Sequence, residues 1–538
     1  MDSQITPRLA LISVSDKTGL ISCAEMLIKH GVKIIATGGT LKHLISNNIL
    51  AEDVTTISQQ PEMLAGRVKT LNGRIFAGIL AKRNDGQHCA DLADYNIPQI
   101  DLVIVNLYPF EKTIAKRDCT LATAIENIDI GGVALLRAAA KNFADVVTVS
   151  QPAQYSTLIN ELNTNNGNVS LNVRKQFAIA AFKHVTDYDC AISEYIESML
   201  EPVEELFFPN KITLQYDKIQ DLRYGENPHQ IAAFYRNIEA ENLNSIIAAK
   251  QLHGKELSYN NILDAESAWS CISFLHKSLN SFINNKKFCV IVKHNNPCGA
   301  AFSVGTQLNA YEKAYKCDPV SAFGGIIAFN TELDKDTATK IIANQFVEVI
   351  IAPVISSEVV ELFAKKPNIR LLQMGECYDE CIADDVEIRH VTGGLLVQSV
   401  DNHMLEDGDM KLMTRKSATY EQLDDMRFAW IVAKYVKSNA IVFVKDGATL
   451  GIGAGQMSRV DSTRLAVSKA NCAKLDLEGS IVASDAFFPF RDGVEEIYRA
   501  GAAAIIQPGG SVKDNEVIQA ANEFDAIMVF TGIRHFRH

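Results

Sequence analysis

Two adjacent residues suited to acid–base chemistry, Lys293 and His294, follow an apolar run that ends at Val292. Pro297 and Gly299 come soon after and predict a polar turn at the end of a strand. A histidine in such a turn can act as a general base, and the neighbouring ammonium can stabilise an oxyanion or protonate a leaving group. The segment therefore predicts a general base beside a stabilising cation.

Three segments near the N-terminus combine glycine, hydroxyl groups and a cation: SVSDKTG (13–19), ATGGT (36–40) and GRVKT (66–70). Backbone N–H groups clustered at a helix start, together with a cation, bind phosphate. Each segment lies at or just beyond the end of a predicted strand, where open α/β sheets bind ligands. One such segment is also what an ordinary helix cap looks like, but three in one domain favour an anionic ligand.

Groups suited to proton transfer lie near these segments. They are Tyr108, Asp129 before a Gly-Gly pair, and Lys141. Asp129 is equally suited to cap a helix, and Lys141 near a helix end can serve only to complement the helix dipole.

Several familiar signatures are absent from the sequence, namely GxxxxGK[ST], HExxH and GxSxG, which excludes P-loop hydrolysis and two protease or esterase classes. Gly451-Ile-Gly-Ala-Gly455 lacks the spacing of a dinucleotide fingerprint, so a structural turn is predicted there. Cys377 and Cys381, with His390 nearby, could hold a metal but lack the second half of a four-ligand zinc site, which favours plain loop cysteines. Pro297-Cys298 resembles part of a zinc-deaminase signature, yet no H-x-E occurs in the chain.

The elements that must position these residues alternate in the first 150 residues. Apolar runs at 9–14, 32–36, 101–105 and 145–149 predict parallel strands, with helices at 17–30, after 38 and at 131–141 between them. A helical stripe of period near 3.6 covers 173–200. The prolines and acidic residues of 201–209 then predict a linker, and we set the domain boundary after residue 208.

The C-terminal region repeats one plan. A helix with Ala268-Trp269 leads to a strand at 288–293, and a helix with Ala429-Trp430 leads to a strand at 440–445. We therefore expect two related α/β halves, about 209–385 and 386–538, connected through the polar region 373–390.

Composition limits the class of protein. The chain has 538 residues, of which 47% are hydrophobic and 22% charged, as in folded globular proteins. A net charge of -12 disfavours nucleic acid and anionic membranes as partners. The 11 scattered cysteines, the lack of a signal peptide and the lack of a run of about 18 apolar residues predict a cytoplasmic protein.

Specific motifs then resemble a known family. LRYGENPHQ (222–230), LSYNNILDAESAW (257–269), VKHNNPCG (292–299), SAFGGIIAFN (321–330), SDAFFPFRDG (484–493) and RHFRH (534–538), with SVSDKTG and GRVKTL, resemble the bifunctional purine-biosynthesis family. That family joins phosphoribosylaminoimidazole-carboxamide (AICAR) formyltransferase to inosine monophosphate (IMP) cyclohydrolase. The resemblance extends, in order, over nearly the whole chain.

The resemblance implies an α/β protein of two domains. Residues 1–208 would be the cyclohydrolase, with a methylglyoxal-synthase-like parallel sheet. Residues 209–538 would be the formyltransferase, built of two cytidine-deaminase-like halves without zinc. It further implies a homodimer, nucleotide substrates and 10-formyltetrahydrofolate as co-substrate, with no metal, nucleic acid or membrane.

The resemblance also implies roles for individual residues. In the formyltransferase, His294 would be the base, assisted by Lys293 and Asn439, and the nucleotide would be held by Arg223, Tyr224 and Arg534. The folate side would be formed by Phe323, Asp485, Phe487, Pro489 and Phe490. In the cyclohydrolase, Lys69, Tyr108, Asp129 and Lys141 would surround the reacting groups. The substrate would be bound by Ser13, Ser15, Lys17, Thr18, Gly39, Thr40, Arg67, Thr70 and Asn106.

One segment departs from the family. After GRVKTL the family continues with a His-Pro pair and a further histidine, whereas residues 72–76 here read NGRIF. The departure concerns the cyclohydrolase pocket and leaves Lys69 in place. Two alternatives remain. The first is a formyltransferase whose N-terminal domain is a nucleotide-binding regulatory module, and the joint presence of Lys69, Tyr108, Asp129 and Lys141 argues against it. The second is a zinc deaminase, and the missing zinc ligands argue against it.

Overall fold

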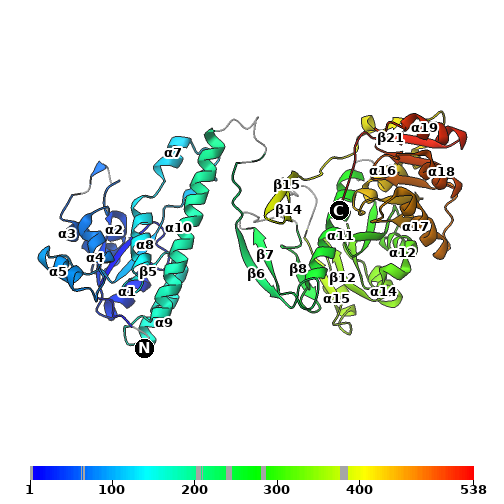
Figure 1. Cartoon of the computed structure of the whole chain (residues 1–538). Coiled ribbons are helices and arrows are strands. Elements are labelled where there is room, and N and C mark those ends of the chain that lie inside the picture. Colours follow the sequence, from blue (N-terminus) through cyan, green and yellow to red (C-terminus); the bar gives the residue numbers. More distant parts are fainter. Residues whose placement is uncertain are drawn as a thin grey trace. The chain divides into compact units, whose positions relative to one another are not determined.

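The computed structural model forms two compact units, Met1–Ile212 and Thr213–His538 (Figure 1). It describes residues 4–61, 63–64, 67–200, 208, 210–237, 245–279, 286–375 and 386–538. The boundary between the two units, after Ile212, lies four residues beyond the boundary predicted from the sequence.

The N-terminal unit contains a five-stranded sheet in the order β3-β2-β1-β4-β5, with all neighbours parallel. The strands are β1 (Leu9–Val14), β2 (Lys33–Ala36), β3 (Glu52–Asp53), β4 (Leu102–Asn106) and β5 (Val147–Val149). The parallel sheet and four of its strands were predicted, and short β3 was not. Strand order reverses at β1, so a crevice is expected outside the carboxyl ends of β1 and β4.

Helices cover both faces of this sheet, because side chains alternate along each buried strand. Ala10 and Ile12 face a cluster that includes α1 and α9, whereas Leu11 faces a second cluster that includes α4, α8 and α10. The helices are α1 (Leu20–Lys29), α2 (Gly38–Ser46), α3 (Thr55–Ser58), α4 (Gly73–Leu80), α5 (Gly86–Asp94), α6 (Phe110–Ile114), α7 (Leu121–Glu126), α8 (Gly131–Lys141), η2 (Pro152–Gln154), α9 (Tyr155–Thr164) and α10 (Leu171–Leu200).

The C-terminal unit is built on one mixed sheet of 12 strands, in the order β16-β21-β20-β19-β17-β18-β10-β9-β11-β12-β13-β8. Two further hairpins, β6-β7 and β14-β15, lie outside it. The strands of the first half are β6 (Tyr216–Leu222), β7 (Ala232–Asn237), β8 (Lys250–His253), β9 (Lys287–Lys293), β10 (Asn296–Ser303), β11 (Gly325–Phe329), β12 (Val347–Ala352) and β13 (Arg370–Gln373). Those of the second half are β14 (Val386–Val391), β15 (Gly394–Ser399), β16 (Lys411–Leu412), β17 (Ile441–Lys445), β18 (Ala448–Gly453), β19 (Ile481–Ser484), β20 (Ala504–Gln507) and β21 (Ile527–Phe530).

The predicted repeat is visible in this order. Each half contributes a hairpin, a short edge strand, a long helix and then five strands, and the halves meet where β10 pairs antiparallel with β18. The first-half helices are α11 (Tyr259–Leu279), α12 (Gln307–Cys317), α13 (Pro319–Ala322), α14 (Lys335–Asn344) and α15 (Ser357–Leu362). The second-half helices are α16 (Tyr420–Lys434), η3 (Asp407–Asp409), α17 (Arg459–Cys472), α18 (Arg491–Arg499) and α19 (Asp514–Glu523).

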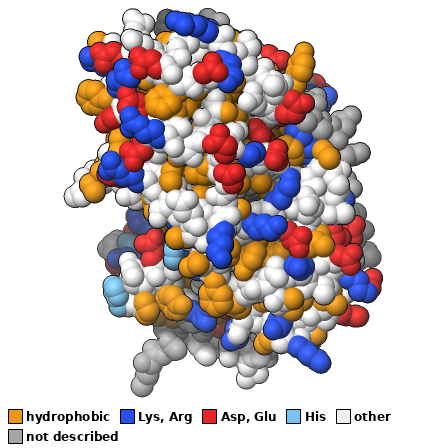
Figure 2. Space-filling model, turned by 90° about the vertical axis from the view of Figure 1, so that its right-hand side faces the viewer, with side chains coloured by type: hydrophobic (Ala, Val, Ile, Leu, Met, Phe, Trp, Pro, Cys, Tyr) orange, Lys and Arg blue, Asp and Glu red, His pale blue; other side chains and the backbone are white. Residues whose placement is uncertain are grey.

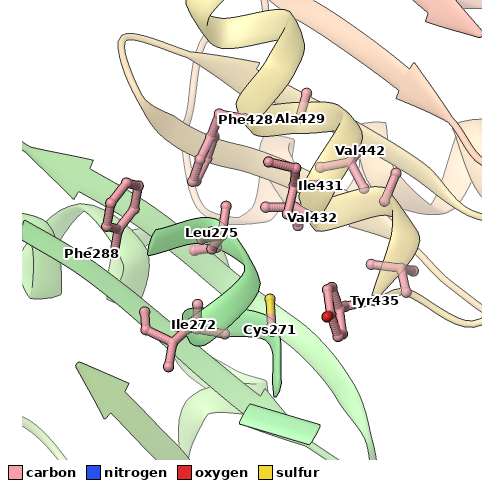
Figure 3. Close-up of a cluster of buried hydrophobic side chains, with 14 of the residues drawn as sticks. Cys271, Ile272, Leu275, Phe288, Phe428, Ala429, Ile431, Val432, Tyr435 and Val442 are labelled. Carbon is pink, nitrogen blue, oxygen red and sulfur yellow. The ribbon is translucent and has the colours of Figure 1, made fainter. Parts of the chain in front are cut away.

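The long helices α11 and α16 share one face of the sheet and one apolar core. Figure 3 shows Cys271, Ile272 and Leu275 of α11 on one side of this core and Phe428 and Val432 of α16 on the other. All five side chains are buried. The two halves therefore bury a common core, in addition to sharing a sheet.

Two equivalent glycines bring strand and helix backbones together on the other face. A Cβ on Gly299 of β10 would lie 2.0 Å from the carbonyl oxygen of Ala314 in α12, and one on Gly451 of β18 would lie 2.4 Å from that of Ala466 in α17. Gly451 and Gly453 thus serve strand–helix packing inside β18, so the turn predicted at these two positions is wrong: they belong to a strand.

No described helix is long and apolar enough to cross a membrane. Figure 2 shows a face on which basic and acidic side chains are interspersed, with apolar side chains between them.

Gly451→Ala should destabilise the C-terminal unit by about 2–3 kcal/mol, because the added methyl group meets backbone and cannot be relieved by a rotamer change. Urea unfolding followed by tryptophan fluorescence reports this unit, since both tryptophans, Trp269 and Trp430, belong to it. Gly408→Ala is the matched control, as nothing lies within 4 Å of the added Cβ. Equal midpoints for the two variants would contradict the close packing.

Candidate active sites

In the N-terminal unit, the carboxyl ends of β1 and β4 are joined by the side chain of Asn106. Its Oδ1 accepts hydrogen bonds from the backbone N–H groups of Ser15 (2.6 Å) and Asp16 (2.9 Å), and its Nδ2 donates to the carbonyl of Asp16 (2.8 Å). The side chain is buried. Asn106 therefore positions the loop after β1, and this use explains its place at the strand end.

The loops after β1 and β2 lie next to each other. Ser13 Oγ and Thr37 Oγ1 are 2.8 Å apart. Thr40 is buried, and its hydroxyl exchanges hydrogen bonds with the backbone of Val14 at 3.0 and 3.1 Å. Thr40 thus ties α2 to β1 and has little hydroxyl capacity left for a ligand.

A cation approaches the N-terminus of α2. The Nζ of Lys69 is 3.4 Å from where a Cβ of Gly38 would lie. The N-terminus of a helix carries partial positive charge, so an ammonium beside it creates a position that favours an anion. Gly39 follows Gly38 in the same helix start, and a Cβ on it would meet nothing within 4 Å.

Other predicted phosphate ligands lie in the same loops with partners of their own. Lys17 Nζ is 3.4 Å from the carbonyl oxygen of Ser15, and the Thr18 N–H donates to Asp16 Oδ1 (2.9 Å). Arg67 forms an exposed ion pair with Glu126, which a bound phosphate would have to displace. Gly66 lies outside the described residues.

Asp129 lies where α8 begins. Its Oδ1 accepts a hydrogen bond from the Gly132 N–H (2.7 Å), and the backbone N–H of Tyr108 also points to the carboxylate. Burial raises the pKa of Asp129 and outweighs these two hydrogen bonds, which act to lower it. Thr70 lies at the same helix start, with its Oγ1 2.9 Å from where a Cβ of Gly131 would lie. Asp129, Tyr108 and Thr70 are therefore brought together.

Lys141 is not brought to this group within the chain. It is the last residue of α8, whereas Asp129 precedes the first, and at 1.5 Å per residue the helix between them spans roughly 15 Å. Its side chain is exposed and complements the helix dipole, the alternative that the sequence left open.

The departing segment 72–76 builds the start of α4. The Asn72 side chain caps this helix by accepting from the Arg74 N–H (2.9 Å). The Arg74 guanidinium donates to the carbonyls of Ile57, Tyr95 and Asn96 at 2.8–2.9 Å. These contacts hold α3, α4 and the end of α5 together, which is a structural role.

In the C-terminal unit, strand directions bring the predicted formyltransferase residues to one edge of the sheet. From the antiparallel pairings, the ends of β9, β18, β19 and β21 and the starts of β10, β11 and β17 lie along the same edge, which we call the loop edge. His294, Asn439, Phe323, Asp485 and Arg534 follow or precede these strand ends.

The turn that carries His294 is held by Asp264 of α11. His294 and Asn295 have φ values of 52° and 60°, and their N–H groups donate to Asp264 Oδ2 (3.2 Å) and Oδ1 (2.7 Å). Lys293 Nζ donates to the carbonyls of Gly324 (2.9 Å) and Phe323 (3.3 Å). Asp264 was missed in the sequence, where no spacing singles it out within its helix.

The same turn is bonded to the second half of the unit. Asn296 Oδ1 accepts from the Lys437 N–H at 2.9 Å. Two residues on, Asn439 donates from its Nδ2 to the carbonyl of Gln456 (2.8 Å). His294 and Asn439 thus belong to one bonded network that crosses the two halves.

Asp485 is fully buried, and both of its carboxylate oxygens have partners. Oδ1 is 3.1 Å from Arg459 Nη2, and Oδ2 accepts from the Ser438 hydroxyl. In this structure Asp485 positions Arg459 and Ser438, and its place on the folate side stays a prediction. Arg459 was also missed, although an arginine directly after the cap Ser458, at the start of α17, was a readable signal.

Two guanidinium groups converge near the C-terminus. Arg459 and Arg534 lie over the Phe536 ring, 5.9 and 4.3 Å from its centroid. Arg223 stacks on Tyr224 (5.8 Å), and their loop reaches α11 where Asn260 donates to the Glu226 carbonyl. Two like charges on one ring favour an anion between them.

Apolar rings are exposed along the loop edge. Phe323 is 63% and Phe490 59% exposed, Pro489 is exposed and Phe487 is half-buried. Exposed aromatic faces suit the flat rings of a ligand.

Among the described residues, no group of three or more His, Cys, Asp or Glu could hold a metal ion. Cys377 and Cys381, the pair weighed as metal ligands, lie outside the described residues.

Comparison with known proteins gives two family matches. A family model described as the AICARFT/IMPCHase bienzyme matches residues 139–469, more than half of the chain, and one described as an MGS-like domain matches residues 19–134. A solved structure titled "Crystal structure of ForH" is 33% identical, covers 36% of this chain and 100% of its own, and superposes with a TM-score of 0.34.

Asp129→Asn should stabilise the N-terminal unit at pH 7. Because the pKa of Asp129 is raised above its ordinary 3.8 in the folded unit, stability falls as pH increases between 3.8 and the folded value, and the loss is complete above it. An amide keeps the shape and does not ionise, so the variant should lack this fall. Differential scanning calorimetry at acid and neutral pH measures both effects, and a variant less stable than wild type at pH 7 would contradict them.

Proposed function

This chain belongs to the AICARFT/IMPCHase bienzyme family, and we propose that each of its two compact units carries one of the two reactions. The protein transfers a formyl group from a folate-type donor to AICAR and closes the product to IMP. The N-terminal unit, which contains the MGS-like domain, is proposed as the cyclohydrolase, and the C-terminal unit as the formyltransferase.

In the formyltransferase, the ring amine of AICAR attacks the formyl carbon of the donor. The new C–N bond forms, the bond from that carbon to the folate nitrogen breaks, and the folate nitrogen leaves with a proton. His294 accepts the amine proton. Two of the three Lys293 hydrogens are engaged by carbonyls, so the third can donate to the developing oxyanion or the leaving nitrogen.

The placement of Asn439 supports this assignment. Its Nδ2 is engaged by Gln456, so its Oδ1 is the atom that can accept a hydrogen bond from the amine or carboxamide of AICAR. Arg459 and Arg534 would hold the nucleotide phosphate, with Arg223 and Tyr224 at the same edge. Phe323, Phe487, Pro489 and Phe490 would line the folate side. We propose 10-formyltetrahydrofolate as the donor.

In the cyclohydrolase, the carboxamide nitrogen attacks the formyl carbon, the ring closes and the formyl oxygen leaves as water. Holding both groups on one molecule supplies much of the rate, since the step is intramolecular. Asp129 accepts the carboxamide proton, and its raised pKa makes it a stronger base than an exposed carboxylate. Lys69 and Tyr108 stabilise the oxyanion, and the helix start of α2 binds the phosphate.

The observation that supports this proposal over a purely regulatory N-terminal unit is that the Asp129 carboxylate faces the backbone N–H of Tyr108. A regulatory nucleotide site needs an anion cradle but has no use for a half-buried carboxylate of raised pKa beside it. Segment 72–76, which departs from the family, caps and anchors α4. Its departure therefore leaves Asp129 and Tyr108 in place.

We also propose a cytoplasmic enzyme that binds small nucleotide and folate molecules, with neither nucleic acid nor membrane as a partner. All nine described cysteines are free, which suits a reducing compartment.

The two sites should be separable by substitution. His294→Ala should lower formyl transfer by about 10²–10⁴-fold, the usual contribution of a general base, and leave the closure of supplied formyl-AICAR unchanged. Lys69→Ala should lower the closure of supplied formyl-AICAR and leave formyl transfer unchanged. A coupled assay with AICAR and 10-formyltetrahydrofolate, following folate release and IMP separately, measures both steps.

Each variant is the control for the other in this assay. Loss of both activities in a folded His294→Ala protein would contradict the division of labour. Wild-type protein that accumulates formyl-AICAR without closing it would show that the N-terminal unit is a regulatory module.

We propose that the chain forms a homodimer through the C-terminal unit. Its hairpins expose apolar side chains, including fully exposed Ile231 beside β7 and half-exposed Leu396 on β15, which a second copy would cover. Ile231→Asp should shift micromolar protein toward monomer in sedimentation velocity. Leu50→Asp, an equally polar change at an exposed leucine of the N-terminal unit, should leave the dimer intact, and a monomeric wild type would refute the proposal.

A further inference from the structure

The last residues of the chain cross the loop edge and are bonded to it through the backbone. The His535 N–H donates to the carbonyl of Asp485 (3.0 Å), and the Ser438 N–H donates to the carbonyl of Arg537 (2.9 Å). The Arg537 N–H donates in turn to Ser438 Oγ (3.2 Å). The terminal segment is therefore part of the edge that carries Asn439.

The side chain of His535 turns inward and meets a carboxylate. It is 2% exposed, its ring centroid is 5.0 Å from that of Trp430, and its Nδ1 is 2.5 Å from Asp401 Oδ2. An ionised carboxylate only accepts hydrogen bonds, so Nδ1 carries the hydrogen. Asp401 belongs to the segment between β15 and β16, more than 130 residues before its partner.

A second buried group fixes Asp401 from the other side. Lys434 of α16 has its Nζ 3.6 Å from Asp401 Oδ1, donates to the carbonyl of Asp401, and lies 3.7 Å from the centroid of the Phe274 ring. Burial acts to raise the pKa of Asp401, but the hydrogen bond from His535 and the charge of Lys434 outweigh it, and the net pKa is lowered. Burial lowers the pKa of Lys434 to about 8. A buried ammonium is tolerated only when it is paired, so the buried Lys434 restricts the half-exposed Asp401 to one position.

Arg534 is the residue whose place depends on this anchor. It directly precedes His535 and is exposed, and among the residues that the structure describes no carboxylate lies within ion-pair distance of its guanidinium. With His535 turned into the core, Arg534 faces outward beside Arg459 over the Phe536 ring. Two guanidinium groups repel each other, so a defined separation needs an external constraint.

We propose that the pair formed by buried His535 and half-exposed Asp401 is a positioning device that holds Arg534 against the phosphate of the nucleotide in the formyltransferase site. The proposal rests on the assignment of the loop edge to formyl transfer. His535 and Asp401 are positioning residues, because in this proposal they act on the substrate only through Arg534. Loss of the pair should loosen substrate binding more than it slows the chemical step.

His535→Leu fills the space against Trp430 but removes the donor, whereas His535→Asn keeps an amide N–H near the place of Nδ1. His535→Leu should raise the KM for AICAR roughly tenfold, the effect of about one charge-assisted hydrogen bond, with kcat within about twofold. His535→Asn should restore most of the affinity. A purely structural role would give loss of kcat or of folded protein in both variants, without rescue.

The matched control is His403→Leu, which removes an exposed histidine–carboxylate pair, His403 with Asp409 (3.2 Å), from the same segment as Asp401. Its KM for AICAR should equal that of wild type. Closure of supplied formyl-AICAR by the N-terminal unit confirms that each protein is intact. If His535→Leu does not fold, Asp401→Asn, which keeps the shape of the partner, should raise the KM for AICAR in its place.

Arg534→Ala separates failure of this inference from failure of the proposed function. If Arg534→Ala leaves the KM for AICAR unchanged, the proposed nucleotide site is wrong. If it raises the KM while His535→Leu and Asp401→Asn do not, the site stands and the positioning role is refuted.

Discussion

The pairing of β10 with β18 is the interaction on which the C-terminal unit depends. It joins two halves that repeat one plan into a single sheet, and its antiparallel direction decides which loops share an edge. Ala301 is paired with Ala448, and the Phe302 N–H donates to the Gly447 carbonyl at 2.8 Å. The turn of His294 from one half therefore lies beside the loops of Asn439 and Asp485 from the other. Neither half alone contains the group proposed for formyl transfer.

Buried and half-buried polar groups set the positions of the exposed ones in both units. Asp264 holds the turn of His294 by two backbone N–H groups, and Asp425 does the same for the equivalent turn of the second half, at Asp446 and Gly447 (2.8 Å each). Asn106 plays this part in the N-terminal sheet. Breaking the hydrogen bonds of a carboxylate or amide that is shielded from water costs more free energy than breaking those of a solvated one. These loops therefore keep one conformation.

Much of the fold could be predicted from local pattern. Alternating apolar runs predicted the parallel N-terminal sheet, and the two tryptophan helices before apolar strands predicted the repeat, because these signals lie within short windows. The site was less predictable. The motif near Lys141 contains a plausible cation, but the length of α8 carries it to the other end of the helix from Asp129. Asp264 and Arg459 were missed because their partners come from other strands.

The sequence by itself determined which residue types are present and which elements carry them: a Lys-His pair after a strand, glycines and hydroxyls after two others, and an aspartate before a helix. Local periodicity and turn chemistry are properties of neighbouring residues, so they are readable along the chain. Only the tertiary structure decided that Asp485 faces inward to Arg459 and Ser438, and that Asp401 pairs with His535. Such contacts join residues far apart in the chain, and burial in a shared core, which no short segment encodes, fixes which of them form.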